Sequence, residues 1–190
     1  MSGSVGTVAD VSEAWALTRA LVRRRYVNVM IAEADGVVRS NSYPRKYPSS
    51  SPLFPSTPWT IDLTDEHSRF WIAVFDLDAK RTEDFEQAAE DLGVLIRTLR
   101  AQNLPHVVCR SSPTGGFHVF LAVDGVDKAV MVRLAAAARA VLPSLDHGLL
   151  CNDRTGAVRP PGAPHAKGGA SAVMDGDASS LATPTITTAD

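Results

Sequence analysis

A nearly continuous apolar run from Phe70 to Leu77 sets the centre of the expected fold. Its length suits a strand, and apolar residues on both faces are typical of a strand that is covered on both sides. The run ends in two acids, Asp76 and Asp78, separated by one residue. Residues two apart in a strand point to the same face. The pattern therefore predicts two carboxylates side by side at the end of a buried strand.

The flanking segments predict an α+β domain. Apolar residues at helical spacing favour helices over residues 10–25, 82–102 and 128–142, with Thr82 and Asp127 as caps. We expect strands at 26–32, 105–110 and 117–123, a turn at Asp35-Gly36, a long Pro-rich and Ser-rich loop at 41–59, and a short hairpin at 149–159. This order predicts a mixed or antiparallel sheet with flanking helices, of ferredoxin-like or RNA-recognition-motif-like topology.

Composition limits the remaining possibilities. The chain has 190 residues and a net charge of -2, so one domain over residues 1–170 and a polar tail or linker over 171–190 are expected. No apolar run approaches the roughly 20 residues that span a bilayer, and the first residues do not have the pattern of a secretory signal. Cys109 and Cys151 form no Cys-x-x-Cys pair, which argues against structural zinc. The expectation is a cytoplasmic protein that does not contact membrane.

The acid pair has two readings. Two adjacent carboxylates repel each other, and a hard divalent cation such as Mg²⁺ or Mn²⁺ relieves that repulsion through oxygen ligands. The alternative is a strand end at which Asp76 and Asp78 meet solvent.

Three downstream segments carry further polar groups. Residues 112–118 include Ser112, the paired Gly115 and Gly116, and His118; glycines allow a backbone to approach a phosphate closely, although a plain glycine hairpin is the alternative. Asp146 is a third carboxylate or a simple turn residue. Residues 159–169 hold three groups that suit phosphate binding or a surface loop: Arg159, His165 and Lys167.

In this order the segments resemble the archaeo-eukaryotic primase superfamily, in particular the primase-polymerases of bacteria, phages and plasmids. That family has an Asp-x-Asp or Asp-x-Glu at a strand end, then Ser/Thr-Pro-x-Gly-Gly-x-His, a third Asp, and Arg-x-Pro-Gly-x-x-His-x-x-Gly. The match covers about residues 70–170, with Pro160-Pro161 as a small variation in the last segment.

The resemblance implies a DNA primase-polymerase that makes or extends primers on single-stranded DNA in phage or plasmid replication. Asp76, Asp78 and Asp146 would hold two Mg²⁺ or Mn²⁺ ions for nucleotidyl transfer. The NTP or dNTP would contact residues of the later segments, namely Ser112, Gly115, Gly116, His118, Arg159, His165 and Lys167. A C-terminal helical accessory domain and a helicase are further implied partners. Template contacts by Arg23, Arg24 and Arg25 are a weaker expectation, drawn from local charge.

Two other functions fit parts of the pattern. The segment Phe75-Asp76-Leu77-Asp78 also resembles the nucleophile motif of haloacid-dehalogenase-like phosphatases, but Ala79-Lys80 follows where that family has Gly-Thr. A non-catalytic module that binds single-stranded nucleic acid would instead expose aromatic residues on its sheet. The candidates for such stacking are Trp71, Phe75, Phe117 and Phe120.

Overall fold

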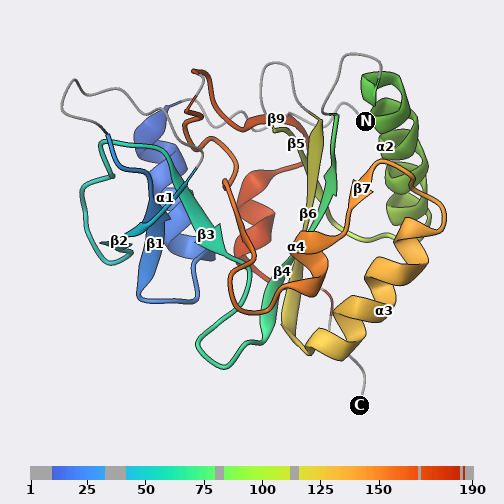
Figure 1. The fold of residues 1–190 in the computed structure, drawn as a ribbon, viewed down its shortest axis with the longest axis horizontal. Helices are drawn as coiled ribbons and strands as arrows, with labels where there is room; N and C mark the ends of the chain where they lie inside the picture. The colour runs from blue at the N-terminus through green and yellow to red at the C-terminus, as the bar shows by residue number, and fades with distance from the viewer. Residues whose placement is uncertain are drawn as a thin grey trace.

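The computed structural model describes residues 10–32, 42–79, 84–111, 116–166, 168–184 and 186. These residues form an α+β fold with two antiparallel sheets and four α-helices. The large sheet has the strand order β7-β4-β6-β5-β9, and the small sheet has the order β2-β1-β3-β8. Figure 1 shows the large sheet in the middle, with α2 and α3 on one side and the small sheet with α1 on the other.

The large sheet is built around β4 (Phe70–Leu77), whose bounds are those expected from the apolar run. Its neighbours are β6 (Phe117–Val126) and β7 (Leu145–Asp146), and β5 (Val107–Arg110) and β9 (Ala172–Asp175) complete the sheet. Helix α2 (Asp84–Ala101) lies against one face, where the rings of Phe85 and Phe117 are 5.4 Å apart. Helix α3 (Lys128–Arg139) and the short α4 (Gly148–Cys151) flank β7 in the sequence.

The small sheet consists of β1 (Tyr26–Val29), β2 (Arg45–Pro48), β3 (Trp59–Asp62) and β8 (Ala157–Val158). Its apolar face packs on α1 (Val11–Leu21), where Trp15 and Trp59 meet edge to face with centroids 5.6 Å apart. Asp10 caps α1 by accepting a hydrogen bond from Glu13 N at 2.8 Å. Thr18 Oγ1 in turn accepts from Trp59 Nε1 at 3.0 Å, which fixes the helix to the sheet.

Three expectations about the chain are wrong. Residues 41–59 do not form one long loop, because β2 lies within them and β3 begins at Trp59. Residues 149–159 form no hairpin: the first part is α4, and β8 pairs with β3, which is distant in the sequence. The described part of the expected tail, residues 171–184 and 186, is not a linker, since β9 pairs with β5 and the 3₁₀ helix η1 (Ala178–Ala182) buries Ala178 and Leu181.

Smaller differences concern the ends of elements. Helix α3 ends at Arg139 rather than near Leu142, and α1 ends at Leu21 because Val22 is extended. Asp127 precedes α3 but makes no capping hydrogen bond with its side chain; its carboxylate pairs with Arg69 instead. The expected turn at Asp35-Gly36 and the cap at Thr82 lie outside the described residues. No described helix combines the length and apolar character that crossing a bilayer requires.

Candidate functional site

Asp146, Asp76 and His118 form a row across three adjacent strands of the large sheet. Asp76 on β4 is the register partner of both Asp146 on β7 and His118 on β6. Side chains directly opposite each other in an antiparallel sheet point to the same face. His118 Nε2 lies 3.4 Å from Asp76 Oδ1, and His118 is only 6% exposed. The structure thus brings together three of the residues that the sequence singled out.

Asp78 follows directly after β4, and a buried carboxylate on α2 helps to fix its position. Asp78 N donates to Ser144 O at 3.0 Å. Ser144 is held in turn by Asp91, which accepts from Ser144 N at 2.7 Å and from Ser144 Oγ at 2.6 Å. Asp91 is 3% exposed and also accepts from Gln87 Nε2 at 2.8 Å. One buried acid therefore positions the turn that leads into Asp146 and that contacts Asp78.

Gly116 lies against the end of β4 at very close range. A Cβ at this position would stand 1.7 Å from Leu77 O and 3.1 Å from Ala79 N. Any side chain would therefore collide with the backbone that carries Asp78. This contact gives Gly116 a packing role, and a phosphate contact by its backbone stays a prediction.

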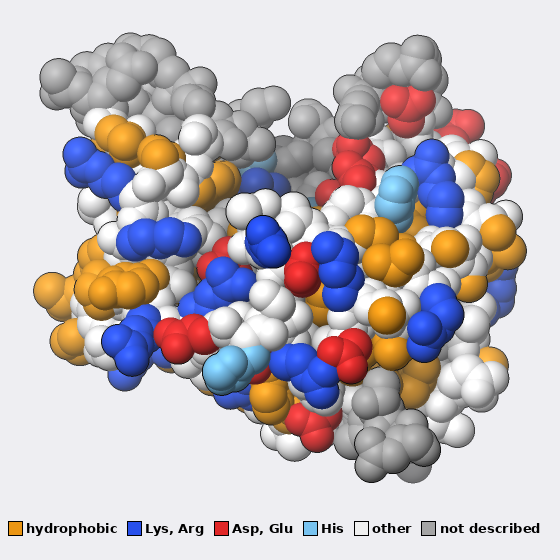
Figure 2. Space-filling view, turned by 60° about the horizontal axis from the view of Figure 1, so that its bottom comes forward, with side chains coloured by type: hydrophobic (Ala, Val, Ile, Leu, Met, Phe, Trp, Pro, Cys, Tyr) orange, Lys and Arg blue, Asp and Glu red, His pale blue; other side chains and the backbone are white. Residues whose placement is uncertain are grey.

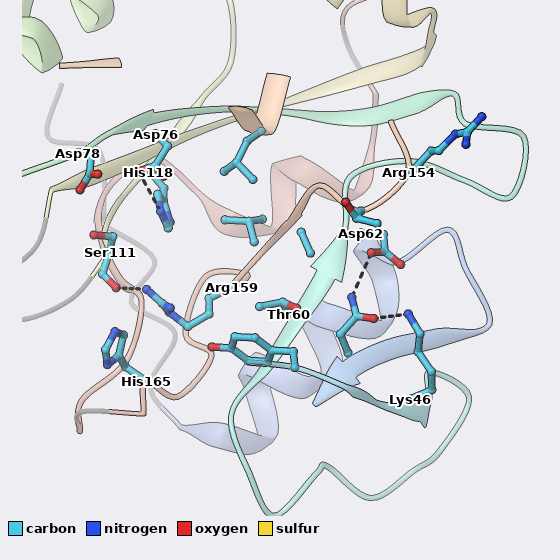
Figure 3. A pocket seen from close by; sticks show the side chains of 16 residues that line it. Lys46, Thr60, Asp62, Asp76, Asp78, Ser111, His118, Arg154, Arg159 and His165 are labelled. Atoms are coloured by element: carbon cyan, nitrogen blue, oxygen red, sulfur yellow. Dashed lines mark hydrogen bonds and ion pairs between the residues drawn. The ribbon is translucent and has the colours of Figure 1, made fainter. Parts of the chain in front are cut away.

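Arg159 and His165 come from the segment that follows β8. The Arg159 guanidinium donates to Ser111 O at 2.7 Å, while Arg159 Nε makes no hydrogen bond with the described residues. The segment is folded back on itself, because His165 N donates to Gly169 O and Gly162 N donates to Ser171 O. Figure 3 shows Arg159 between the Asp76–His118 pair and Thr60 of the small sheet.

A cleft of about 690 Å³ lies between the two sheets and joins these residues. Asp76, Asp78, Ser111, His118, Arg159 and His165 line one side. The small sheet and nearby turns supply the other side, through Asn28, Tyr43, Lys46, Thr60, Asp62, Arg154, Thr155, Ala157 and Val158. Leu149 also contributes. This volume lies within the range of about 300–1,000 Å³ that is usual for small-molecule sites.

Sequence reasoning missed the small-sheet side of the cleft entirely. Its signal was present as strand alternation: in β1 and β3 the polar residues Asn28, Thr60 and Asp62 alternate with apolar ones. The expectation of a loop up to residue 59 hid this pattern. All three residues are at most 7% exposed, which is unusual for polar side chains.

The carboxylates have the ligand chemistry of a divalent-cation site, with Asp146 turned partly aside. Asp146 Oδ1 accepts from Gly148 N at 2.9 Å, and Asp146 lines a neighbouring hollow that shares only Asp78 with the cleft. Among the described residues, no three His, Cys, Asp or Glu side chains stand together as a ready metal-binding group. The register of Asp76 beside Asp146 nevertheless places two like charges directly opposite each other, which costs stability that a cation would offset.

The three successive arginines serve different contacts. Arg24 donates to Thr64 O at 3.0 Å and to Thr64 Oγ1 at 2.5 Å, and it lies 3.5 Å from Asp62. Arg23 stacks over the Trp71 ring at 4.9 Å, and the exposed Arg25 pairs with Glu66 at 3.5 Å. None of the three lines the cleft. Template contact by these arginines stays a prediction, although Arg24 is largely committed to the fold.

Three predicted site residues, Ser112, Gly115 and Lys167, lie outside the described residues. Their proposed phosphate contacts therefore remain predictions from the sequence. The chain matches no model of a known protein family, and no curated protein matches it.

Proposed function

We propose that this chain is the catalytic domain of a DNA primase-polymerase, which makes or extends primers on single-stranded DNA by nucleotidyl transfer. The observation that carries the proposal is the row of Asp146, Asp76 and His118 beside a cleft that also holds Arg159. The motifs that contribute these residues are far apart in the sequence. Asp76, His118 and Arg159 converge on one cleft, and Asp146 adjoins Asp76 in register, which supports a shared chemical task.

The topology also supports the proposal. The succession β4-α2-β5-β6-α3-β7 follows the strand–helix–strand–strand–helix–strand order of ferredoxin-like and RNA-recognition-motif-like folds. Within it the strands are arranged as β7-β4-β6-β5, with all neighbours antiparallel. We infer an RNA-recognition-motif-like core in which Asp76 lies on the inner strand β4 and Asp146 on the edge strand β7.

In this proposal Asp76, Asp78 and Asp146 hold two Mg²⁺ or Mn²⁺ ions. Such ions, when bound, activate the attacking 3′-hydroxyl and offset charge on the leaving pyrophosphate. His118 and Arg159 bind the triphosphate of the NTP or dNTP and orient it, with His165 nearby in the same cleft. The basic and acidic side chains are interspersed on the face shown in Figure 2 rather than gathered into one basic patch, so template affinity is expected to be modest.

The binding-module alternative has less support, because the aromatic residues that it needs are covered. Phe75 and Phe117 are each 3% exposed and Phe120 is fully buried. Arg23 lies over the fourth candidate, Trp71. Stacking of bases requires an open ring face. For the phosphatase alternative, three strands, β1 to β3, precede the acid pair, whereas the motif that it resembles opens its chain.

The deciding experiment is a nucleotide-incorporation assay on primed and unprimed single-stranded DNA, with Mg²⁺ or Mn²⁺ and with each nucleotide type. We expect template-dependent and metal-dependent incorporation. Absence of incorporation under all these conditions would overturn the proposal. Metal-dependent hydrolysis of a phosphomonoester would favour the phosphatase, and DNA binding that does not depend on metal, without incorporation, would favour the binding module.

A further inference from the structure

The small sheet turns a polar face toward the cleft. Asn28 on β1 is the register partner of Lys46 on β2 and of Thr60 on β3, so the three side chains form a row on one face. Asp62 lies two residues after Thr60 and shares that face. The opposite face, with Trp59 among its residues, packs on α1. A buried polar face in the middle of a sheet calls for partners.

Asn28 connects the two charged side chains of this face. Lys46 Nζ donates to Asn28 Oδ1, Asn28 Nδ2 donates to Asp62 Oδ1 at 3.0 Å, and Arg24 lies 3.5 Å from Asp62 Oδ2. Figure 3 shows the hydrogen-bonded side chains of Lys46 and Asp62 on the far side of the cleft from Asp76 and His118. Because Asn28 and Asp62 already have partners within the protein, they are poor candidates for the main ligand contacts on this wall.

Two neutral hydroxyls on the same wall have no such partners. Thr60 Oγ1 and Tyr43 OH are both buried and make no hydrogen bond with the described residues. Both residues line the cleft, and Thr60 is 5% exposed. A buried hydroxyl without a partner costs about 1–3 kcal/mol, so native proteins rarely retain one without a water or ligand to satisfy it.

We infer that Thr60 and Tyr43 form a subsite for the nucleoside part of the nucleotide. This inference rests on the proposed function, in which the triphosphate lies on the opposite wall near Asp76, His118 and Arg159. If the phosphates of a nucleotide bind there, its sugar and base contact the rest of the cleft. Neutral hydroxyls that both donate and accept suit sugar hydroxyls or base edges better than they suit phosphates.

The test is the isosteric variant Thr60→Val, with Tyr43→Phe as its companion. Affinity for an NTP or dNTP is measured by titration calorimetry with Mg²⁺ and no template, which separates binding from turnover. We expect each variant to bind nucleotide roughly 2- to 10-fold more weakly, the effect of one neutral hydrogen bond. Since neither hydroxyl has a partner among the described residues, each substitution breaks no such hydrogen bond, and Tm should not fall.

Thr18→Val is the matched control. Thr18 is also a buried threonine, on the far side of the small sheet, and its hydroxyl is satisfied: it donates to Ala14 O at 2.7 Å and accepts from Trp59 Nε1. This variant should lose roughly 2–8 °C in Tm and keep its nucleotide affinity. The two threonines should therefore show opposite patterns of stability and binding.

The choice of ligand distinguishes the possible contacts. Inorganic triphosphate should bind wild type and Thr60→Val equally, because it lacks a nucleoside. A loss confined to NTPs identifies the 2′-hydroxyl; a loss shared with dNTPs but not with dideoxynucleotides identifies the 3′-hydroxyl; and a loss for all three identifies the base.

Three negative results have different meanings. If wild type binds nucleotide and both hydroxyl variants bind it equally well, the subsite is wrong while the proposed function stands. An equal loss for inorganic triphosphate would also overturn the subsite, since the effect would then lie at the phosphates. If wild type binds no nucleotide at all, the proposed function fails and the subsite fails with it.

Discussion

The cleft has one wall from each sheet, and the two walls differ in how their polar groups are satisfied. On the large sheet, acids and a histidine stand next to one another in register, with Asp76 between Asp146 and His118. On the small sheet, Asn28 links Lys46 and Asp62, and two neutral hydroxyls remain without partners among the described residues. The first arrangement suits cations and phosphates, whereas the second suits an uncharged ligand group. In the proposed function, this difference divides one nucleotide between the two walls.

The largest expected effect comes from removing the acid pair of the large-sheet wall. Asp76→Ala combined with Asp78→Ala should lower nucleotide incorporation by more than about 10³-fold, since the metal contribution of several kcal/mol is lost. Circular dichroism should show an intact fold, because both acids lie at a strand end and like charges are removed. Incorporation is measured with a labelled nucleotide on single-stranded DNA.

Asp124→Ala is the control for the double variant, because Asp124 is an exposed acid on β6 that does not line the cleft. It should retain full activity. Synthesis that persists in the double variant would contradict both the metal assignment and the functional contrast between the walls.

The large-sheet wall could be predicted from the sequence because the motifs that indicate it are short and continuous. The apolar run predicts both ends of β4, and the acid pair, Gly116 and His118 lie at or next to the ends of strands, where motifs are easiest to recognise. The lateral order of the strands was not accessible in the same way. The pairing of Asp76 with Asp146 depends on β7, a strand of only two residues.

The small-sheet wall was not accessible because its strands are short and its pairing partners are distant. Prolines around β2 predicted a loop, since they disfavour central strands, but β2 lies at the edge of its sheet, where proline is tolerated. β8 has two residues and pairs with β3 almost 100 positions earlier, so nothing near it in the sequence predicts a partner. Residues 172–182 have no strong periodicity, and they are held by partners distant in the sequence: β9 pairs with β5, and η1 contacts α1 and β6.

The second largest effect tests whether the large-sheet wall depends on Asp91, the buried acid that holds Ser144. Asp91→Ala leaves the buried Ser144 N–H and hydroxyl without their acceptor, which should cost about 3 kcal/mol of unfolding free energy. Because Ser144 O also accepts from Asp78 N, Mn²⁺ affinity should fall as well. Urea unfolding measures the first quantity and electron paramagnetic resonance of Mn²⁺ the second.

The exposed Glu90, one residue earlier on the same helix, provides the control variant Glu90→Ala. It should change neither quantity appreciably. If Asp91→Ala is as stable as wild type, the turn that carries Ser144 is held by other contacts, and the role assigned to Asp91 is wrong.

A smaller effect separates phosphate contacts from metal contacts on the same wall. His118→Ala should raise the apparent KM for nucleotide roughly 10- to 100-fold, the usual range for losing a hydrogen bond to a charged group. The Mn²⁺ requirement should change little, because His118 is assigned to the triphosphate. His106→Ala removes a half-buried histidine outside the cleft and should leave KM unchanged. An unaltered KM in His118→Ala would remove its assigned role.

The smallest effect concerns the closed end of the large-sheet row. Cys109 on β5 is the register partner of His118 and shares its face, yet it is fully buried and lies outside the cleft. Burial raises the pKa of the Cys109 thiol from 9.0 to about 12. The unfolded chain loses this proton first as pH rises, so the stabilisation is fully present below pH 9 and declines toward pH 12, by at most about 1.4 kcal/mol per pH unit. At pH 8, iodoacetamide should label the half-buried Cys151 well before Cys109, as read by peptide mass spectrometry. Rapid labelling of Cys109 in the folded protein would mean that the cleft extends past His118. The contrast between a row that is open to the cleft and a closed core behind it would then not hold.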